Sequence, residues 1–117
     1  MTILITATMD LDPAHAERII LGARDLIEAS LAEPGCDAYS WALDPLHPGR
    51  IHVFESWATE AALAHHFSLP NYLEMRTHLR SAGPIVSRSR KYRVDFDEPV
   101  YDDTGTPRAD FFSAAAG

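Results

Sequence analysis

The chain has 117 residues, an apolar content of 46% and a formal net charge of −7, which suits one domain with a single core. The acidic balance argues against nonspecific binding to nucleic acid or to an anionic membrane, and no apolar run approaches the roughly 20 residues that a membrane span needs. The single cysteine, Cys36, cannot form an internal disulfide, which suits a reducing compartment, and no basic and apolar leader is evident. We therefore expect a soluble, cytoplasmic protein that binds neither nucleic acid nor membranes.

The first third of the sequence has the pattern of a strand followed by an amphipathic helix. Every second residue over residues 3–9 is apolar, as in a β-strand with one buried face. Asp12 then supplies a helix cap, and a proline follows it in the first turn. Apolar residues recur at helical spacing over residues 16–31, which predicts one helix of about five turns. A proline-glycine pair ends this segment.

Two strands are predicted next, over residues 36–43 and 50–57, because both segments alternate and contain aromatic and β-branched residues. The segment between them is dense in turn-forming residues, so the two strands should form an antiparallel hairpin. A helix capped by Thr59 is predicted to about residue 67, and a second helical run to about residue 80. A last strand is predicted over residues 85–96.

The predicted order β-α-β-β-α-β is the ferredoxin-like arrangement, an α+β fold with a four-stranded antiparallel sheet and both helical segments on one face. Residues 1–96 would form this domain. Residues 97–117 show no periodicity, so we expect an irregular C-terminal extension. The helix-free face of the sheet would expose an apolar patch that monomers rarely tolerate. We therefore expect a homodimer built on this face, with the extension packed on the partner subunit.

Several short segments of the sequence occur together in one known family. They comprise a proline-glycine-cysteine opening of the second strand, a proline-glycine hairpin, an aromatic-Glu-x-Trp strand end, an acidic-Ala-Leu helix start and a later histidine. Here they are residues 34–39, residues 44–50, Phe54 to Trp57, residues 60–63 and His66, and a Leu-Pro-Asn-Tyr segment at residues 69–72 follows them. Their order and spacing resemble the antibiotic biosynthesis monooxygenase family.

The resemblance implies a dimeric α/β barrel with a pocket in each subunit between the sheet and the helices. Several relatives oxidise aromatic polyketides or quinols with molecular oxygen and without metal or flavin, whereas heme-degrading relatives bind heme in the same pocket. The family's site pattern is an Asn on the first strand, a Trp on the third and a His on the second helical segment. Trp57 and His66 match it, but Thr6 or Thr8 takes the first-strand position, which argues against heme degradation.

His66 is the predicted catalytic residue, because a histidine in an apolar pocket can titrate near neutrality and deprotonate a phenol or quinol. The alternative is a helix-face histidine bonded to neighbouring backbone, and Trp57 could equally be a core anchor. Flat aromatic side chains suit a planar substrate. The side chains predicted to bind the substrate are Trp57, Tyr72, Trp41, His52, Phe67 and Met75.

Other kinds of site receive less support from the sequence. His65, His66 and His78 lack the spacing of a metal-ligand set and have no cysteine partner, so no metal site is predicted. Arg88 or Arg90 could pair with a carboxylate of the substrate.

The leading hypothesis is a cofactor-independent monooxygenase, an oxidoreductase that oxidises a phenolic or quinol-like aromatic small molecule with O2. One alternative is a non-catalytic dimeric barrel that binds a ligand or is associated with stress. The other is a heme-binding or heme-degrading relative. The fold alone cannot decide among them, because function depends on the site.

Overall fold

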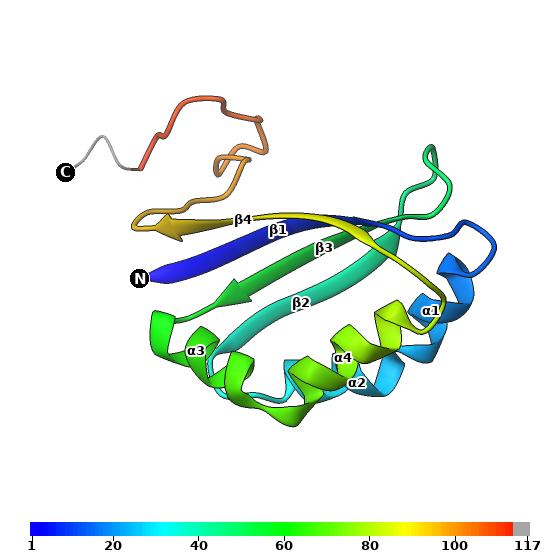
Figure 1. The fold of residues 1–117 in the computed structure, drawn as a ribbon. Coiled ribbons are helices and arrows are strands. Elements are labelled where there is room, and N and C mark those ends of the chain that lie inside the picture. The colour runs from blue at the N-terminus through cyan, green and yellow to red at the C-terminus, as the bar shows by residue number, and fades with distance from the viewer. Residues whose placement is uncertain (114–117) are drawn as a thin grey trace.

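The computed structural model describes residues 1–113, which form a sheet with helices on one side of it (Figure 1). In chain order the elements are β1 (Thr2–Asp10), α1 (Ala16–Gly22), α2 (Arg24–Leu31), β2 (Cys36–Leu43), β3 (Arg50–Trp57), α3 (Glu60–Ser68), α4 (Pro70–Arg80) and β4 (Val86–Val94). The strands are antiparallel and lie in the order β2-β3-β1-β4. The predicted ferredoxin-like α+β fold is confirmed. No helix within the described residues is long and apolar enough to cross a membrane.

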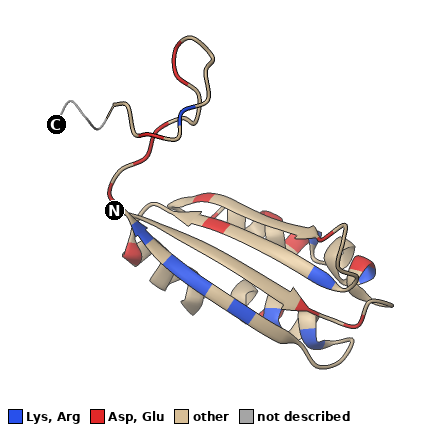
Figure 2. Ribbon diagram, turned by 90° about the horizontal axis from the view of Figure 1, so that it is seen from above, with Lys and Arg blue, Asp and Glu red and all other residues tan. Residues whose placement is uncertain are grey.

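Alternation along the strands decides which side chains meet the helices. On β3, Ile51, Val53 and Trp57 face the helices and are buried, whereas Phe54 on the opposite side is 41% exposed. Trp57 and Ile51 are completely inaccessible to solvent, and burying each such side chain contributes roughly 1.5–3 kcal/mol to folding. Seen from above, the other face of the sheet has no helix over it (Figure 2). The sheet therefore has an inner face, towards the helices, and an outer face.

The predicted five-turn helix is instead two helices that meet at Ala23, which corrects the prediction. The cause lies in α4, whose His78 donates a hydrogen bond from Nε2 to the carbonyl oxygen of Ile19 (2.7 Å). The N–H of Ala23 therefore bonds to the carbonyl of Ile20 (3.1 Å), a tighter i to i−3 contact that interrupts the α-helix. Gly22 permits the approach, since a Cβ there would lie 3.1 Å from the His78 ring.

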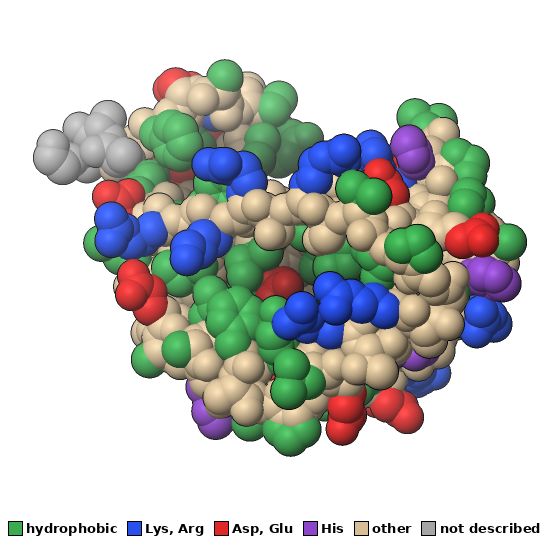
Figure 3. Space-filling model, in the orientation of Figure 1, with side chains coloured by type: hydrophobic (Ala, Val, Ile, Leu, Met, Phe, Trp, Pro, Cys, Tyr) green, Lys and Arg blue, Asp and Glu red, His purple; other side chains and the backbone are tan. Residues whose placement is uncertain are grey.

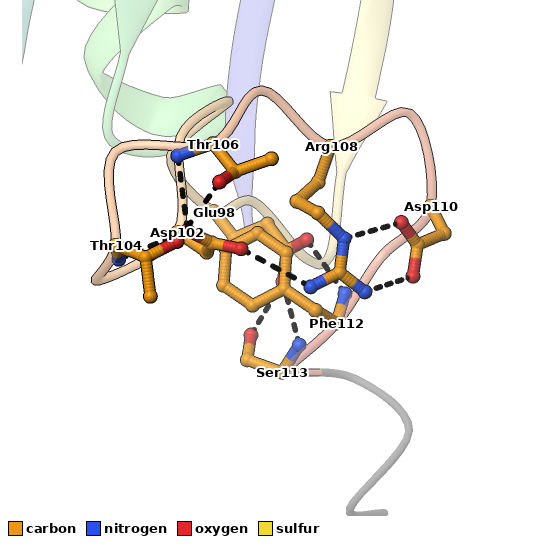
Figure 4. Close-up of polar contacts among 8 residues, drawn as sticks. All are labelled: Glu98, Asp102, Thr104, Thr106, Arg108, Asp110, Phe112 and Ser113. Atoms are coloured by element: carbon orange, nitrogen blue, oxygen red, sulfur yellow. Dashed lines mark hydrogen bonds and ion pairs between the residues drawn. The ribbon is translucent and has the colours of Figure 1, made fainter.

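Beyond β4 the chain leaves the sheet as an irregular arm, residues 95–113 (Figures 1 and 2). The arm turns at Asp102, whose carboxylate accepts hydrogen bonds from the backbone N–H groups of Thr104 (3.0 Å) and Thr106 (3.1 Å) (Figure 4). Arg108 donates to the same carboxylate (3.3 Å). The arm is thus held in shape by its own polar contacts.

A second group of contacts brings the end of the arm back to its start. The Glu98 carboxylate accepts hydrogen bonds from the backbone N–H groups of Phe112 and Ser113, both at 2.9 Å (Figure 4). The side chain of Phe111 is 62% exposed, so apolar area in the arm is left without cover in one subunit. Packing of this arm on a partner subunit stays a prediction, and the rest of the expected extension, residues 114–117, lies outside the described residues.

Candidate active site

A cavity of about 400 Å³ opens between the inner face of the sheet and helices α3 and α4. Figure 3 faces its mouth: below β4 the surface is hollowed, with mostly hydrophobic side chains inside and Lys or Arg side chains at the rim. The wall residues that carry the chemistry discussed below are Tyr39, Trp41, Glu55, His66, Phe67, Tyr72, Met75, Arg76 and Arg80.

His66 lies on the inward side of α3. The helix begins at Thr59, whose side chain accepts the N–H of Ala62 (3.0 Å), and helical spacing then turns Leu63 and His66 towards the core. The His66 side chain is almost fully buried but contributes to the cavity wall. The local sequence of α3 therefore delivers a histidine to an otherwise apolar interior.

The Nδ1–H group of His66 donates to both carboxylate oxygens of Glu33, at 3.0 and 2.9 Å. Because an ionised carboxylate only accepts hydrogen bonds, this contact keeps a hydrogen on Nδ1. The second ring nitrogen, Nε2, has no hydrogen-bond partner within residues 1–113. His66 is thus oriented with one nitrogen occupied and the other available as a base.

Glu33 is a buried carboxylate whose contacts are all supplied by neighbouring side chains. It follows α2 and is 8% exposed. Asn71, at the start of α4, donates from Nδ2 to Glu33 (2.9 Å) and to the hydroxyl oxygen of Ser30 (3.1 Å). Since an unpaired buried charge is strongly destabilising, His66 and Asn71 together make the burial of Glu33 tolerable.

Aromatic rings surround His66. The ring of Trp57 lies 4.6 Å from the imidazole, centroid to centroid, at an interplanar angle of 35°. Tyr72 and Tyr39 meet it nearly edge-on at 5.4 and 5.7 Å, and Phe67 lies at 5.8 Å. Such packing fixes the ring orientation and leaves flat apolar walls for a planar ligand.

Glu55 places a second carboxyl group in the cavity wall. Its Oε1 accepts a hydrogen bond from Nε1–H of Trp57 (2.9 Å). Burial raises the pKa of Glu55, and the nearby carboxylate of Glu33 raises it further, whereas the hydrogen bond from Trp57 and the proximity of the His66 imidazole lower it. Burial also raises the pKa of Tyr39, so its phenol stays neutral at physiological pH. The cavity therefore combines His66 with an acid that holds its proton more tightly than an exposed glutamate.

The structure brings most of the predicted site residues together. His66, Trp41, Phe67, Tyr72 and Met75 all line this cavity. Trp57 is not among the wall residues: its completely buried ring lies behind His66, which is the position expected of the alternative, a core anchor.

His52 is placed elsewhere. Strand alternation puts it on the outer face, where its Nε2 lies 2.8 Å from the carboxylate of Asp44, so its predicted place in the same site is wrong. Thr6 and Thr8 share the outer face with Arg88 and Arg90, where a separate hollow of about 750 Å³ lies. The first-strand positions that face His66 are the apolar ones, and they include no amide side chain.

Sequence reasoning missed Glu33, Glu55 and Asn71. Glu55 could have been found from the sequence, because it is the one charged residue among the positions of β3 that face inward, between Val53 and Trp57. Glu33 and Asn71 left none, since their partners lie far along the chain. No group of three or more His, Cys, Asp or Glu side chains that could hold a metal ion occurs within residues 1–113.

Comparison with known proteins agrees with this architecture. Residues 2–78 match the family model of antibiotic biosynthesis monooxygenases. An uncharacterised protein of Synechocystis sp. is 33% identical over 72 residues, 62% of this chain and 49% of that protein, so the chain spans about half the length of this curated relative.

Two solved structures show the same fold. A candidate antibiotic biosynthesis monooxygenase from Deinococcus radiodurans is similar with a TM-score of 0.75 at 19% identity, covering 86% of this chain and 99% of the other. Another, from Caulobacter crescentus, gives a TM-score of 0.62 at 25% identity, covering 83% and 91%. On the strength of the family match over most of its fold, this chain belongs to the antibiotic biosynthesis monooxygenase family.

Proposed function

We propose that this protein is a cofactor-independent monooxygenase that oxidises a phenolic or quinol-like aromatic small molecule with O2. The observation that carries the proposal is the buried His66, held by Glu33 through Nδ1 and left free at Nε2 on the wall of an aromatic-lined cavity. Family membership supports an oxidoreductase, and the site favours chemistry that begins with removal of a proton.

In the proposed reaction the Nε2 atom of His66 takes the proton of a substrate hydroxyl. The resulting anion gives up electrons to O2, and a bond forms between a ring carbon and oxygen to give a peroxide. The carboxylate of Glu33, bonded to Nδ1–H, stabilises the positive charge that His66 gains. The histidine thus supplies a base without any group from outside the chain.

Glu55 can complete the proton balance. As a protonated acid it donates to the peroxide, and as a carboxylate it then removes the hydrogen from the oxygenated ring carbon. The O–O bond breaks, the carbon becomes a carbonyl, and the departing hydroxide takes the proton stored on His66. One oxygen atom of O2 ends in the product and the other in water. The raised pKa of Glu55 suits the first of these duties.

The cavity walls suit a flat substrate. Phe67 and Tyr72 lie 5.0 Å apart, centroid to centroid, and with Trp41 they offer aromatic faces on which a ring can stack. Excluding water from such a cavity protects the anion and the peroxide from side reactions. A small aromatic substrate therefore fits both the shape of the site and its chemistry.

The functional unit we propose is a homodimer joined through the outer face of the sheet. Phe54 and Tyr92 are 41% and 46% exposed there, and a hollow lined by both crosses this face. A second sheet is the natural cover for such a surface. The arm at residues 95–113 begins at the end of β4 and would then reach the partner.

Oxygen uptake with a panel of quinols, in parallel with heme titration followed by absorbance, separates the proposed activity from a ligand-binding barrel and from heme degradation. His66→Ala should abolish uptake, whereas His65→Ala, the exposed neighbour on the same helix, should leave it unchanged. The cavity offers no first-strand amide beside His66, so we expect no heme turnover. Uptake that survives His66→Ala would overturn the assignment of the base.

A further inference from the structure

We propose that the C-terminal arm of one subunit, residues 95–113, docks in a basic groove between α3 and β4 of the partner subunit. The groove is a hollow of about 410 Å³. It is distinct from the cavity of His66, which Arg76 and Arg80 line from α4. The inference rests on the homodimer of the proposed function, and it adds a contact between arm and groove to the contact between the two sheets.

The groove has an apolar floor and a basic side. Ile3 and Leu63 are buried in the floor, and Phe67 beside them is 47% exposed. The side chains of Lys91 and Arg93 line the same hollow from β4. Figure 3 shows hydrophobic side chains between the end of β4 and α3, with Lys or Arg side chains above them. Such a surface suits a segment that is both apolar and acidic.

The charges of β4 are mostly without partners. The strand carries four cations and no carboxylate, and the cations are Arg88, Arg90, Lys91 and Arg93. Within residues 1–113 only Arg88 among them forms an ion pair, to Asp10 at 3.8 Å. Glu60, the one carboxylate in the groove wall, forms no ion pair within the same residues. Because β4 is an edge strand, its cations also oppose edge-to-edge pairing with a second β4. A partner for this strand must bring negative charge.

The arm has the complementary composition. Its carboxylates outnumber its cations, with Asp95, Asp97, Glu98, Asp102, Asp103 and Asp110 against Arg108 alone. Three of them, Asp95, Asp97 and Asp103, are exposed and form no ion pair in the part of the chain that the structure describes. Phe96 and Phe111 pack against each other at 6.0 Å, centroid to centroid, and are 42% and 62% exposed. The arm therefore offers an aromatic pair and free negative charge, as the groove requires.

The arm turns away from the groove of its own subunit. It leaves the end of β4 on the side of the sheet that lies away from the helices (Figure 1), whereas the groove lies on the helical side. The outer-face dimer places the partner on the side to which the arm extends. Two packed sheets lie about 10 Å apart, and residues 95–101 alone can span up to about 23 Å. The arm is thus long enough to pass the edge of the partner's sheet and reach the groove beyond it.

Docking in this groove would also support the wall of the active-site cavity. Phe67 lines both hollows, and its ring lies 5.8 Å from that of His66. An aromatic pair seated over the exposed side of Phe67 would hold this ring in place from outside. Each subunit would then complete one wall of its partner's cavity.

The test reverses charge on either side of the contact, with the dimer Kd of the full-length chain measured by sedimentation equilibrium. In homodimers of the groove variant, Lys91→Glu/Arg93→Glu, or of the arm variant, Asp95→Lys/Asp97→Lys, like charges face each other in both contacts. Each Kd should rise at least about tenfold, since two partly exposed ion pairs are lost in each of the two grooves. An equimolar mixture of the two variants should form heterodimers about as tight as the wild type, because both contacts then join opposite charges.

Arg18→Glu/Arg24→Glu is the matched control, because it changes the net charge as the groove variant does, at exposed positions of α1 and α2. Its Kd should stay close to that of the wild type. Wild-type Kd values in both reversal variants would overturn the docking. So would a mixture without rescue, which would show that these charges act within one chain.

The same samples separate this inference from the proposed function. A wild-type chain that stays monomeric at micromolar concentration would overturn the homodimer and the docking together. Oxygen uptake by the wild type is measured independently. A rescued heterodimer of a chain that consumes no oxygen would therefore refute the monooxygenase and leave the docking standing.

Discussion

Replacing Glu33 by glutamine tests the link between the buried carboxylate and the histidine. The carboxylate receives hydrogen bonds from His66 (3.0 and 2.9 Å) and Asn71 (2.9 Å), so both of its oxygens act as acceptors. A glutamine of nearly the same shape offers one acceptor and one donor. If its oxygen faces His66, its NH2 group meets the NH2 group of Asn71. If its oxygen faces Asn71, its NH2 group meets Nδ1 of His66.

Each arrangement has a calculable consequence. Two opposed buried donors leave unsatisfied groups, which costs about 1–3 kcal/mol of unfolding free energy. The second arrangement avoids this only if His66 moves its hydrogen from Nδ1 to Nε2, and then the nitrogen proposed as the base is already protonated. The second arrangement leaves no buried donor unsatisfied, so we expect it to form. Glu33→Gln should then lower oxygen uptake by about 100-fold or more, the usual contribution of a general base, with a smaller loss of stability than the first arrangement would cause.

Two measurements read this outcome separately. The ¹⁵N shifts of the imidazole, assigned by comparison with His66→Gln, report which nitrogen carries the hydrogen, and thermal unfolding reports stability. Glu28→Gln, on the surface of α2, is the control and should change neither the tautomer nor uptake. If Glu33→Gln retains Nδ1–H on His66 together with full oxygen uptake, Glu33 does not orient the base.

Three further predictions follow from other contacts. Glu55→Gln keeps an acceptor for Trp57 but removes the buried charge. Because burial raises the folded-state pKa of Glu55, the wild type loses stability as pH rises from its unfolded value of about 4.3 through the folded pKa. The variant should therefore have a higher Tm than the wild type at pH 8 and the same Tm below pH 4. A Tm difference that does not change with pH would contradict this. Gly35→Ala should destabilise the fold by at least about 1–2 kcal/mol in denaturant titration, since φ is +81° and the new Cβ would lie 2.6 Å from Ala62; unchanged stability would disprove the strain. Truncation after Phe96 should weaken the dimer in sedimentation, because burying one aromatic contributes roughly 1.5–3 kcal/mol, and an unaltered dimer would show that the arm makes no intersubunit contact.

Local patterns were sufficient to predict most of the fold. Alternation and turn residues predicted β2 and β3 with the bounds observed, because both signals lie within the segment that they describe. The first helix was predicted without its break, since the cause is a hydrogen bond to Ile19 from His78, which is distant in sequence. Periodicity carries no information about such a contact.

The site divides in the same way. His66 was predicted to lie in a cavity from the family resemblance, and the alternation of β3 could have placed Glu55 there and His52 on the outer face. The partnership of Glu33 with His66 depends on how α2, α3 and α4 pack, and it joins residues 33 positions apart. Buried polar contacts of this kind follow from the tertiary structure rather than from local sequence.

The central claim is most directly tested by ¹⁸O2 labelling with a quinol substrate, using protein treated with chelator and free of heme and flavin. The proposed chemistry predicts one ¹⁸O atom in the quinone product and one in water, at a rate that His66→Gln reduces by at least about 100-fold. Product without ¹⁸O, a requirement for added heme or metal, or equal rates in the wild type and His66→Gln would contradict it.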